Sequence, residues 1–297
     1  MDLKTRATVA TLVSSFFWGS SFPVIGYGVK FINPFLFLFL RFLIAVPVAL
    51  VVFIALKKPL LPALRSGTVW FLGALNALAF VLQYAAQGWT SATNVALFIN
   101  LYIIFVAVGS VTFLKERPSW PLGVAIGLGF VGVYLVETNA GTASISFETV
   151  KGDIFALIAG LVWSVYIILS KMILSVGEKK DRLSPEQLTG GVCITTLVPL
   201  SFVLPLVIQG PIEQYPIVIG LAIYLAVFTT ILAYLLWYNG LKELSAIATQ
   251  VLVLLEVAFA AIISFVVFKD RFGPGTVLGG LIICIAAFLA TYNPKNR

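Results

Sequence analysis

The sequence lacks histidine altogether and contains two cysteines. Without histidine, the chain has no Ser-His or Cys-His pair of the kind that activates enzyme nucleophiles, and a zinc site is not expected. Cys193 and Cys284 both lie inside long apolar runs, so we expect two separate, buried thiols and no disulfide. No P-loop is present, which argues against ATP-driven transport by this chain alone. These absences predict a protein that is not an enzyme and that uses no cofactor and no metal.

Charged residues are scarce as well. They make up 10% of the 297 residues, whereas a soluble globular protein carries about 25%. Hydrophobic residues make up 60%, and several apolar runs reach the ~20 residues that a helix needs to cross a bilayer. The net charge of +7 sits in short loops between these runs, so nucleic acid is not an expected partner. The sequence therefore predicts an all-α, polytopic membrane protein embedded in the lipid bilayer.

A long internal repeat divides the chain. Residues 91–117 and 245–271 are apolar runs that start with Ser-Ala and end in Lys, an acidic residue and Arg. The offset between them is 154 residues (245 − 91), and the same offset aligns Phe105 with Phe259. A repeat of this length indicates two related structural units.

The apolar runs predict about ten membrane spans, five in each unit. We expect a first five-helix repeat over residues 1–137, a polar linker over 138–151 and a second five-helix repeat over 152–297. The predicted spans cover approximately residues 7–29, 33–56, 68–88, 92–114, 120–136, 152–174, 185–208, 217–241, 246–268 and 275–292.

The positions of Lys and Arg predict the orientation in the membrane. With the N-terminus in the cytoplasm, 14 of these residues fall on the cytoplasmic side and 5 on the other side. This asymmetry predicts a multi-pass protein of the cell membrane with both termini cytoplasmic. Because each unit has an odd number of spans, the second unit is inserted upside down relative to the first. Inverted repeats of this kind are a recurrent transporter design, with the binding site at the repeat interface near the middle of the membrane.

Short motifs recur in the same order in both units. The first unit has Trp18-Gly19-Ser20-Ser21-Phe22-Pro23, Arg41-Phe42 and Lys115-Glu116-Arg117, and the second has Trp163-Ser164, Leu255-Glu256 and Lys269-Asp270-Arg271. Their order and spacing resemble the drug/metabolite transporter superfamily, EamA type. The resemblance implies ten helices around a central cavity, and export or exchange of small metabolites without ATP. The chain departs from the family at the proline that usually bends the fourth and ninth spans: Leu101 and Val257 stand there. The departure leaves the bend and the substrate open.

Two charged residues inside predicted spans are candidates for binding. Glu256 lies in the middle of the ninth span, where an ionised group costs several kcal/mol unless it faces a cavity or a partner. It is interpreted as a substrate or proton-coupling carboxylate, or as a structural hydrogen-bond acceptor. Arg41 either extends to the outer membrane surface, pairs with Glu256, or holds a substrate carboxylate. Lys171 is expected to extend to the inner surface. The middle of the membrane is expected to contain no carboxylate pair of the kind that an intramembrane enzyme needs.

Aromatic and amide side chains inside the spans are further candidates for lining a cavity. Interfacial belts explain Trp and Tyr at the membrane edges, and we place Trp237 and Tyr238 there, but belts do not explain such residues in the middle. Local packing of the rings, and hydrogen bonds that join helices, are the alternatives. The substrate-binding candidates, with the two charged ones, are Trp18, Arg41, Tyr84, Asn94, Asn100, Tyr102, Trp163, Tyr166, Tyr234, Gln250 and Glu256.

The polar candidates predict a secondary transporter or facilitator, exporter or exchanger, of small metabolites such as amino acids, working by alternating access. A lipid flippase, a passive channel, and a transporter of sugar phosphates or nucleotide sugars are the alternatives. Glycines in the fifth and tenth spans form small-residue faces suited to close helix packing or to a dimer contact. The expected partner is a small-molecule solute, and the sequence is compatible with a monomer as well as a homodimer.

Overall fold

The computed structural model describes residues 2–86, 88–90, 92–138, 150–175, 182–207, 211–269 and 273–291. Within these ranges the secondary structure is helical and contains no strand. The first unit comprises α1 (Leu3–Gly28), α2 (Pro34–Ala55), α3 (Leu61–Leu64), α4 (Gly67–Ala86), α5 (Ala92–Asn100), α6 (Tyr102–Thr112) and α7 (Trp120–Thr138). The second comprises α8 (Val150–Ser175), α9 (Pro185–Val207), α10 (Tyr215–Tyr224), η2 (Leu225–Leu232), α11 (Ala233–Glu243), α12 (Ala246–Val253), α13 (Leu255–Ile263), η3 (Ser264–Phe268) and α14 (Pro274–Thr291).

The sequence sets the start of the first two helices through side-chain caps. Asp2 accepts a hydrogen bond from the backbone N–H of Thr5 at 2.7 Å, and hydrogen bonding with the Thr5 side chain and this N–H lowers the pKa of the Asp2 carboxyl. Asn33 accepts from the N–H of Phe35 at 2.9 Å, and Pro34 follows at the first helical position, where its missing N–H costs nothing.

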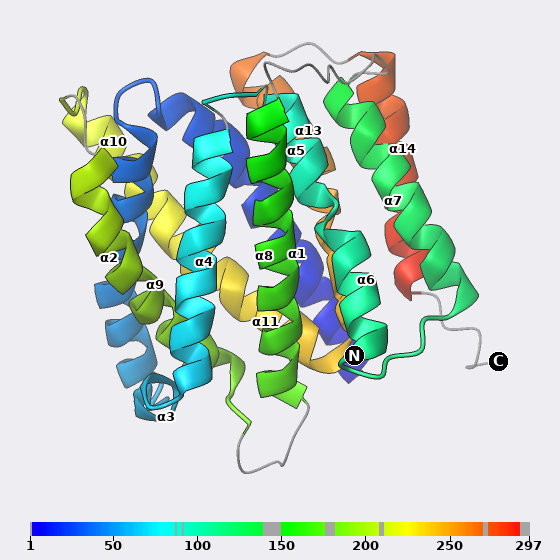
Figure 1. Cartoon of the computed structure of the whole chain (residues 1–297), viewed down its shortest axis with the longest axis horizontal. Helices are drawn as coiled ribbons and strands as arrows, with labels where there is room; N and C mark the ends of the chain where they lie inside the picture. Colours follow the sequence, from blue (N-terminus) through cyan, green and yellow to red (C-terminus); the bar gives the residue numbers. More distant parts are fainter. Residues whose placement is uncertain are drawn as a thin grey trace.

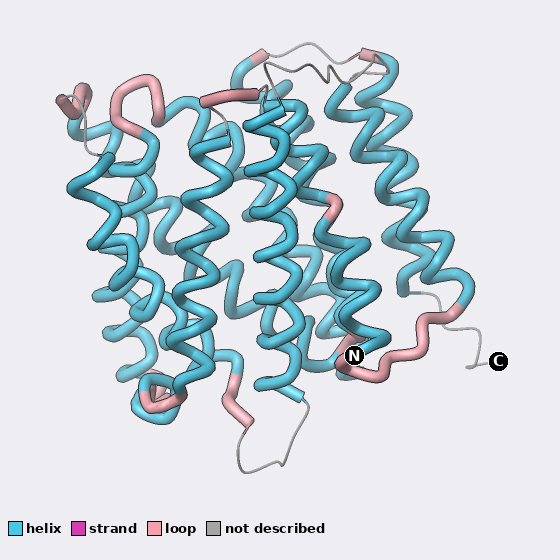
Figure 2. The backbone as a smooth tube through the Cα atoms, in the orientation of Figure 1, coloured by secondary structure: helices cyan, strands magenta, loops and turns pink. Residues whose placement is uncertain are grey.

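The spans alternate in direction across the molecule (Figure 1). α1 begins and α14 ends at one face, which we call the terminal face, and α2 and α8 begin at the opposite face. The loops lie at these two faces (Figure 2). Nine of the described helical segments are long and apolar enough to cross a membrane, and the 23-residue α9 occupies the place of the predicted seventh span. The predicted polytopic helical fold is therefore confirmed.

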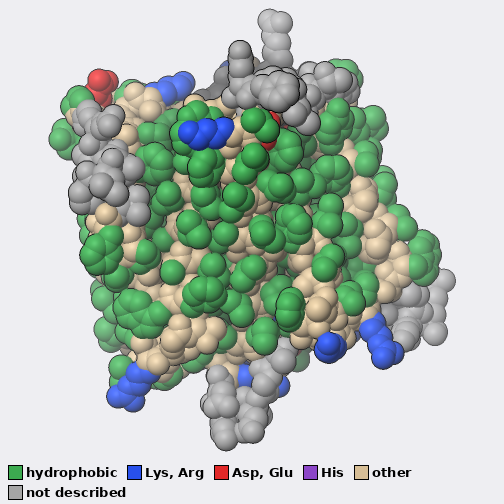
Figure 3. Space-filling view, in the orientation of Figure 1, with side chains coloured by type: hydrophobic (Ala, Val, Ile, Leu, Met, Phe, Trp, Pro, Cys, Tyr) green, Lys and Arg blue, Asp and Glu red, His purple; other side chains and the backbone are tan. Residues whose placement is uncertain are grey.

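The outside of the helical bundle is apolar. Hydrophobic side chains cover the middle of the face in Figure 3, and Lys and Arg side chains lie near its upper and lower ends. Val51, Ile54 and Phe288 are among the large apolar residues that remain exposed, as expected where lipid is the solvent. Cys284 is exposed too, so the expectation that both cysteines are buried is wrong. α14 turns its glycine face toward α7, which leaves Cys284 on the outer side.

Small residues bring α7 and α14 close together, as the glycine faces predict. A Cβ atom on Gly279 would lie 2.5 Å from the carbonyl oxygen of Gly132, and a Cβ on Gly132 would lie 2.8 Å from that of Gly279. Gly123 and Gly127 lie on the same helix but have open space beside them. The close approach of these two helices therefore depends on Gly132 and Gly279.

The fourth and ninth spans are both broken in the middle, although neither contains the proline that the family usually has there. The fourth breaks at Leu101, between α5 and α6, and the ninth breaks at Leu254, between α12 and α13. The breaks lie at corresponding places, because the repeat offset of 154 takes Tyr102, the first residue of α6, to Glu256, the second of α13. Interruptions of this kind mark binding sites in transporters.

Candidate functional site

A cavity of about 700 Å³ lies between the two units. Its walls come from helices of both: α1, α2, α4, α5, α6 and α7 of the first, and α8, α11, α12 and α13 of the second. Val29 and Glu137, at the ends of α1 and α7 that lie at the face opposite the termini, belong to the lining. The cavity thus extends from the middle of the bundle toward that face.

The structure places ten of the eleven candidate residues in the lining of this one cavity. Asn94 does not line it. Its side-chain amide donates to Thr90 Oγ1 at 3.1 Å and to Asp153 Oδ1 at 3.0 Å, which ties the start of α5 to the first turn of α8. The ten residues that line the cavity are Trp18, Arg41, Tyr84, Asn100, Tyr102, Trp163, Tyr166, Tyr234, Gln250 and Glu256.

Arg41 points into the protein and does not extend to the membrane surface. Its side chain is 3% exposed, its Nε donates to Thr230 Oγ1 at 2.6 Å, and its Nη2 donates to the carbonyl of Thr229 at 3.1 Å. Trp18 Nε1 donates to the same carbonyl at 3.0 Å. Both acceptors belong to η2, a π-helical segment, and such segments occur frequently at functional sites.

Some candidates have their polar atoms satisfied by the protein itself. Tyr234 donates its hydroxyl hydrogen to Asn76 Oδ1 at 3.0 Å, and Asn76 donates to Thr196 Oγ1 at 3.0 Å. For Tyr234, the interpretation that its hydroxyl joins helices α11, α4 and α9 therefore has direct support.

Other polar atoms of the lining are buried and have no hydrogen-bond partner among the described residues. Two are donors, Trp237 Nε1 and Gln250 Nε2, and two are acceptors or hydroxyls, Asn100 Oδ1 and Tyr102 Oη. Each of the four residues is at most 6% exposed. A buried polar group without a partner is costly, so these atoms mark places where a bound solute gains hydrogen bonds.

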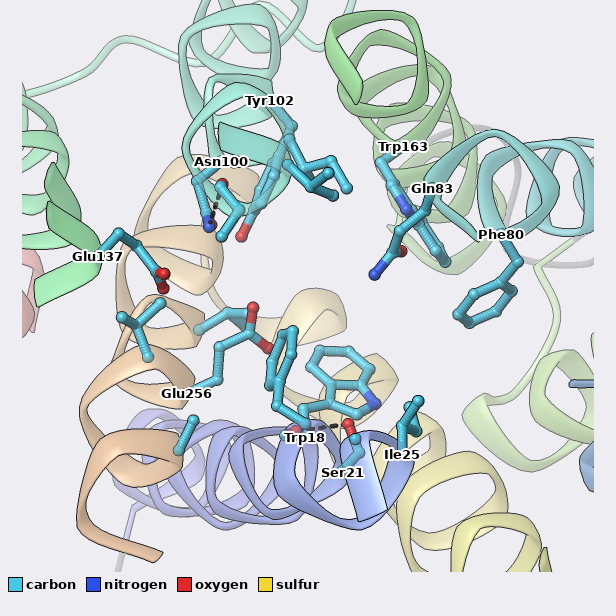
Figure 4. Close-up of a pocket in the computed structure, with 18 of the residues that line it drawn as sticks. Trp18, Ser21, Ile25, Phe80, Gln83, Asn100, Tyr102, Glu137, Trp163 and Glu256 are labelled. Carbon is cyan, nitrogen blue, oxygen red and sulfur yellow. Dashed lines mark hydrogen bonds between the residues drawn. The ribbon is translucent and has the colours of Figure 1, made fainter. Parts of the chain in front are cut away.

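Glu256 reaches the cavity from α13, and Glu137 reaches it from the last turn of α7 (Figure 4). Within the described residues, Glu256 makes no side-chain hydrogen bond or ion pair, so its interpretation as a structural hydrogen-bond acceptor has no support. The predicted fifth span ends at residue 136, directly before Glu137, but α7 continues to Thr138. Glu137 is the second-to-last residue of α7, at a helix end that borders the cavity.

Toward the terminal face, the cavity ends at a layer of aromatic residues. The hydroxyls of Tyr166 and Tyr238 form a hydrogen bond, and the ring of Trp237 stacks on Tyr166 with 6.2 Å between centroids. Trp237 and Tyr238 are at most 2% exposed, so the prediction that they belong to an interfacial belt is wrong. Tertiary packing buries them where hydropathy alone places them near the membrane edge.

Below this layer, two charged side chains bind the ends of helices. Lys171 Nζ donates to the carbonyls of Leu241, Lys242 and Leu244 at 2.7 to 3.2 Å, at the C-terminus of α11. A cation at a helix C-terminus is favourable, and this contact replaces the predicted extension of Lys171 to the inner surface.

Glu116 joins the two units at the terminal face. The N–H of Ala246, the first residue of α12, donates to both carboxylate oxygens of Glu116 at 3.0 and 3.1 Å. Burial raises the pKa of Glu116, and the hydrogen bonds from Ala246 act in the opposite direction. Asp270 is the repeat counterpart of Glu116 and lies outside the described residues, as does most of the predicted loop 178–182.

Comparison with known proteins places this arrangement in a family. The model of the EamA-like transporter family matches residues 5–138 and 150–292. A protein named as an uncharacterized transporter of Archaeoglobus fulgidus is 30% identical and covers 98% of both chains, and the uncharacterized transporter YyaM of Bacillus subtilis is 26% identical over 95% of both chains. A crystal structure with 18% sequence identity covers 96% of this chain and 98% of its own, with a TM-score of 0.84, and shows the same fold. The chain therefore belongs to the EamA-like transporter family, as its motifs predict, and is a membrane transporter with an internal repeat.

Proposed function

We propose that the protein is a secondary transporter, working as an exporter or exchanger, for small dipolar metabolites such as amino acids. One observation carries this proposal. A single cavity between the two units is lined by unmatched donors at Trp237 and Gln250, by the buried guanidinium of Arg41, and by unmatched acceptors at Asn100 and Tyr102. A solute with a carboxylate and an ammonium group satisfies both kinds of site.

The lining argues against strongly anionic solutes. Recognition of a phosphate favours a cluster of Lys or Arg, and among the residues that the structure describes Arg41 is the only Lys or Arg in the cavity lining. Its neighbours are aromatic: the guanidinium lies 5.3 Å from the ring centre of Phe80 and 5.8 Å from that of Phe42. Such contacts are compatible with a guanidinium that binds one carboxylate and not a phosphate.

We further propose that the solute crosses by alternating access, in which the units 1–137 and 152–297 rock about the cavity. The aromatic layer and the contact between Glu116 and Ala246 close the cavity toward the terminal face, whereas its lining extends to the opposite face. A passive channel needs a continuous pore, which this closed end does not offer. The excess of Lys and Arg at the terminal face supports a cytoplasmic location for that face in the cell membrane.

Uptake into proteoliposomes tests the proposed function. With radiolabelled neutral, basic, acidic and aromatic amino acids on one side, we expect saturable flux of at least one class, and acceleration when the same solute is present on the other side. Empty liposomes and liposomes with Arg41→Gln protein serve as controls. If no member of the panel crosses faster than in empty liposomes, the amino-acid proposal is contradicted.

The contact between Glu116 and Ala246 predicts how the closed end responds to mutation. Glu116→Ala removes a carboxylate that holds α12 of the second unit to the loop before α7 of the first, so we expect the cavity to open more often toward the terminal face. The measurement is thiol labelling from that face of an Ile167→Cys reporter, placed in the cavity lining of a chain without its native cysteines. We expect labelling several-fold faster than in the parent.

The matched control is Asp2→Asn, which alters a carboxylate of the same face that caps α1 through Thr5. Asparagine also caps helices well, so its labelling rate should equal that of the parent. Equal rates for Glu116→Ala and Asp2→Asn would contradict a role of Glu116 in closure.

A further inference from the structure

We propose that Asn100, Tyr102, Glu137 and Glu256 form a site that holds the ammonium group of the solute and carries a proton when the solute is absent. This inference rests on the proposed transport function. It adds that the ammonium group of the solute is recognised and that a proton takes its place when the solute leaves. The four side chains come from three separate spans, the fourth, the fifth and the ninth.

Glu137, Glu256 and Tyr102 direct oxygen atoms to the same part of the cavity, and the amide of Asn100 lies beside them (Figure 4). The Nδ2 of Asn100 donates to the carbonyl of Ala96 at 2.9 Å. A carbonyl only accepts, so this bond fixes the orientation of the amide and leaves Asn100 Oδ1 for the cavity. Tyr102 is 6% exposed, and its buried hydroxyl has no hydrogen-bond partner among the described residues.

The two helix breaks explain why these residues meet. Asn100 ends α5 and Tyr102 begins α6, on either side of the break at Leu101. Glu256 follows the break at Leu254 and is the repeat counterpart of Tyr102, at the offset of 154. The C-terminal end of α5 carries partial negative charge, which adds to the attraction for a cation.

The neighbouring backbone holds Glu256 in place. A Cβ atom on Gly19 of α1 would lie 2.6 Å from the carbonyl oxygen of Glu256, so the backbones of α1 and α13 approach closely at this residue. Trp18, which directly precedes Gly19 in α1, presents its indole to the cavity near Glu256 (Figure 4). An aromatic face next to carboxylates is a favourable surface for an ammonium ion.

The chemistry of these groups selects an ammonium ion over a neutral solute. An ammonium has three N–H donors and no acceptor, and it finds here two carboxylates, an amide oxygen and a phenol oxygen. The titratable groups that face Glu256 from neighbouring helices are Glu137 of α7 and Tyr102 of α6. Two ionised carboxylates that face each other inside a membrane protein repel each other, so a proton binds to the pair when the ammonium leaves. Binding of one ammonium then releases one proton to the solution.

Isothermal titration calorimetry on the full-length protein in detergent tests the site with three ligands that share one ring: phenylethylamine, N-acetyl-phenylethylamine and phenylpropionate. We expect the amine to bind and the acetylated compound to bind at least tenfold more weakly, since the charge-assisted hydrogen bonds are lost. Titrations in two buffers of different ionisation enthalpy count the protons. We expect release of up to one proton per amine.

Variants assign the effect to the site. Glu137→Gln and Glu256→Gln should each weaken amine binding by about tenfold or more and reduce proton release. Tyr102→Phe should weaken binding but leave proton release unchanged. The control is Glu213→Gln, an exposed carboxylate in the loop before α10, which should behave as the parent.

Specific results overturn the inference. Equal affinity for the amine and its acetylated form does so, as does proton release that persists in both Gln variants. Titration of sodium chloride, with choline chloride as the control salt, tests for a metal site. If sodium binds and no amine binds, the oxygens hold a metal cation and the inference is overturned. The flux assay distinguishes failure of this inference from failure of the proposed function. If a neutral, non-amine solute is transported and no amine binds, the protein is a transporter without an ammonium site. Amine binding at the pair with no flux of any solute supports the site and contradicts the transport proposal.

Discussion

Arg41→Gln is expected to lower the flux of carboxylate-bearing solutes by about tenfold to a hundredfold, which corresponds to loss of hydrogen bonds to a charged group. The guanidinium lies in the cavity wall, held by Thr229 and Thr230 of η2, and it is the cation available there for a carboxylate. Glutamine removes the charge but can still donate a hydrogen bond. Initial rates of proteoliposome uptake at several concentrations provide the measurement.

The control for this experiment is Arg65→Gln, which changes an arginine in the loop after α3, outside the cavity. Arg41→Lys adds a second comparison, because it keeps the charge but loses the planar arrangement of donors. If Arg41→Gln transports as fast as Arg65→Gln while remaining folded, Arg41 has a structural role and the carboxylate is held elsewhere.

Gly279→Ala is expected to destabilise the protein by about 1–3 kcal/mol, the usual range for overpacking. The new Cβ would lie 2.5 Å from the carbonyl oxygen of Gly132 and 2.8 Å from the amide nitrogen of Val136, and backbone atoms cannot yield as a flexible side chain can. We expect a clearly lower midpoint of thermal unfolding in detergent. Because Glu137 directly follows Val136, amine binding should weaken as well.

The adjacent glycine offers a matched control. Gly280 has no atom within 4 Å of an added Cβ, and alanine is the better helix former by about 1 kcal/mol. Gly280→Ala should therefore leave the unfolding midpoint unchanged or raise it. If both variants lower the midpoint equally, the effect comes from the helix itself and not from the contact between α7 and α14.

Local sequence patterns predict the membrane spans, whereas tertiary packing decides which side chains reach the cavity. Hydropathy and the repeat predict the spans to within a few residues, because burial in lipid imposes long apolar runs. Charge inside a span indicates Arg41 and Glu256 as cavity residues for the same reason. Glu137 was missed because it lies at the end of a span, where a charged residue is ordinary. Its importance depends on how α7 is placed beside α13.

Other features have no local signal. The bends at Leu101 and Leu254 occur without proline, so no single residue marks them in the sequence. Lys171 resembles any cation near a membrane edge, and the three carbonyls at the C-terminus of α11 that bind it come within reach only when α8 and α11 are packed together. Asn94 carries the same amide as Asn100, yet it serves the packing of α5 on α8.

The carbonyl of Thr229 links the two units in a way that bears on the whole transport cycle. This one backbone oxygen, in the second unit, receives hydrogen bonds from Trp18 and Arg41, both in the first. Any displacement of η2 relative to α1 and α2 therefore strains both bonds together. A ligand that displaces the guanidinium of Arg41 also alters the hydrogen bond of the Trp18 indole, because both bonds share one acceptor atom. This coupling favours a concerted transition of the cavity wall over a gradual one.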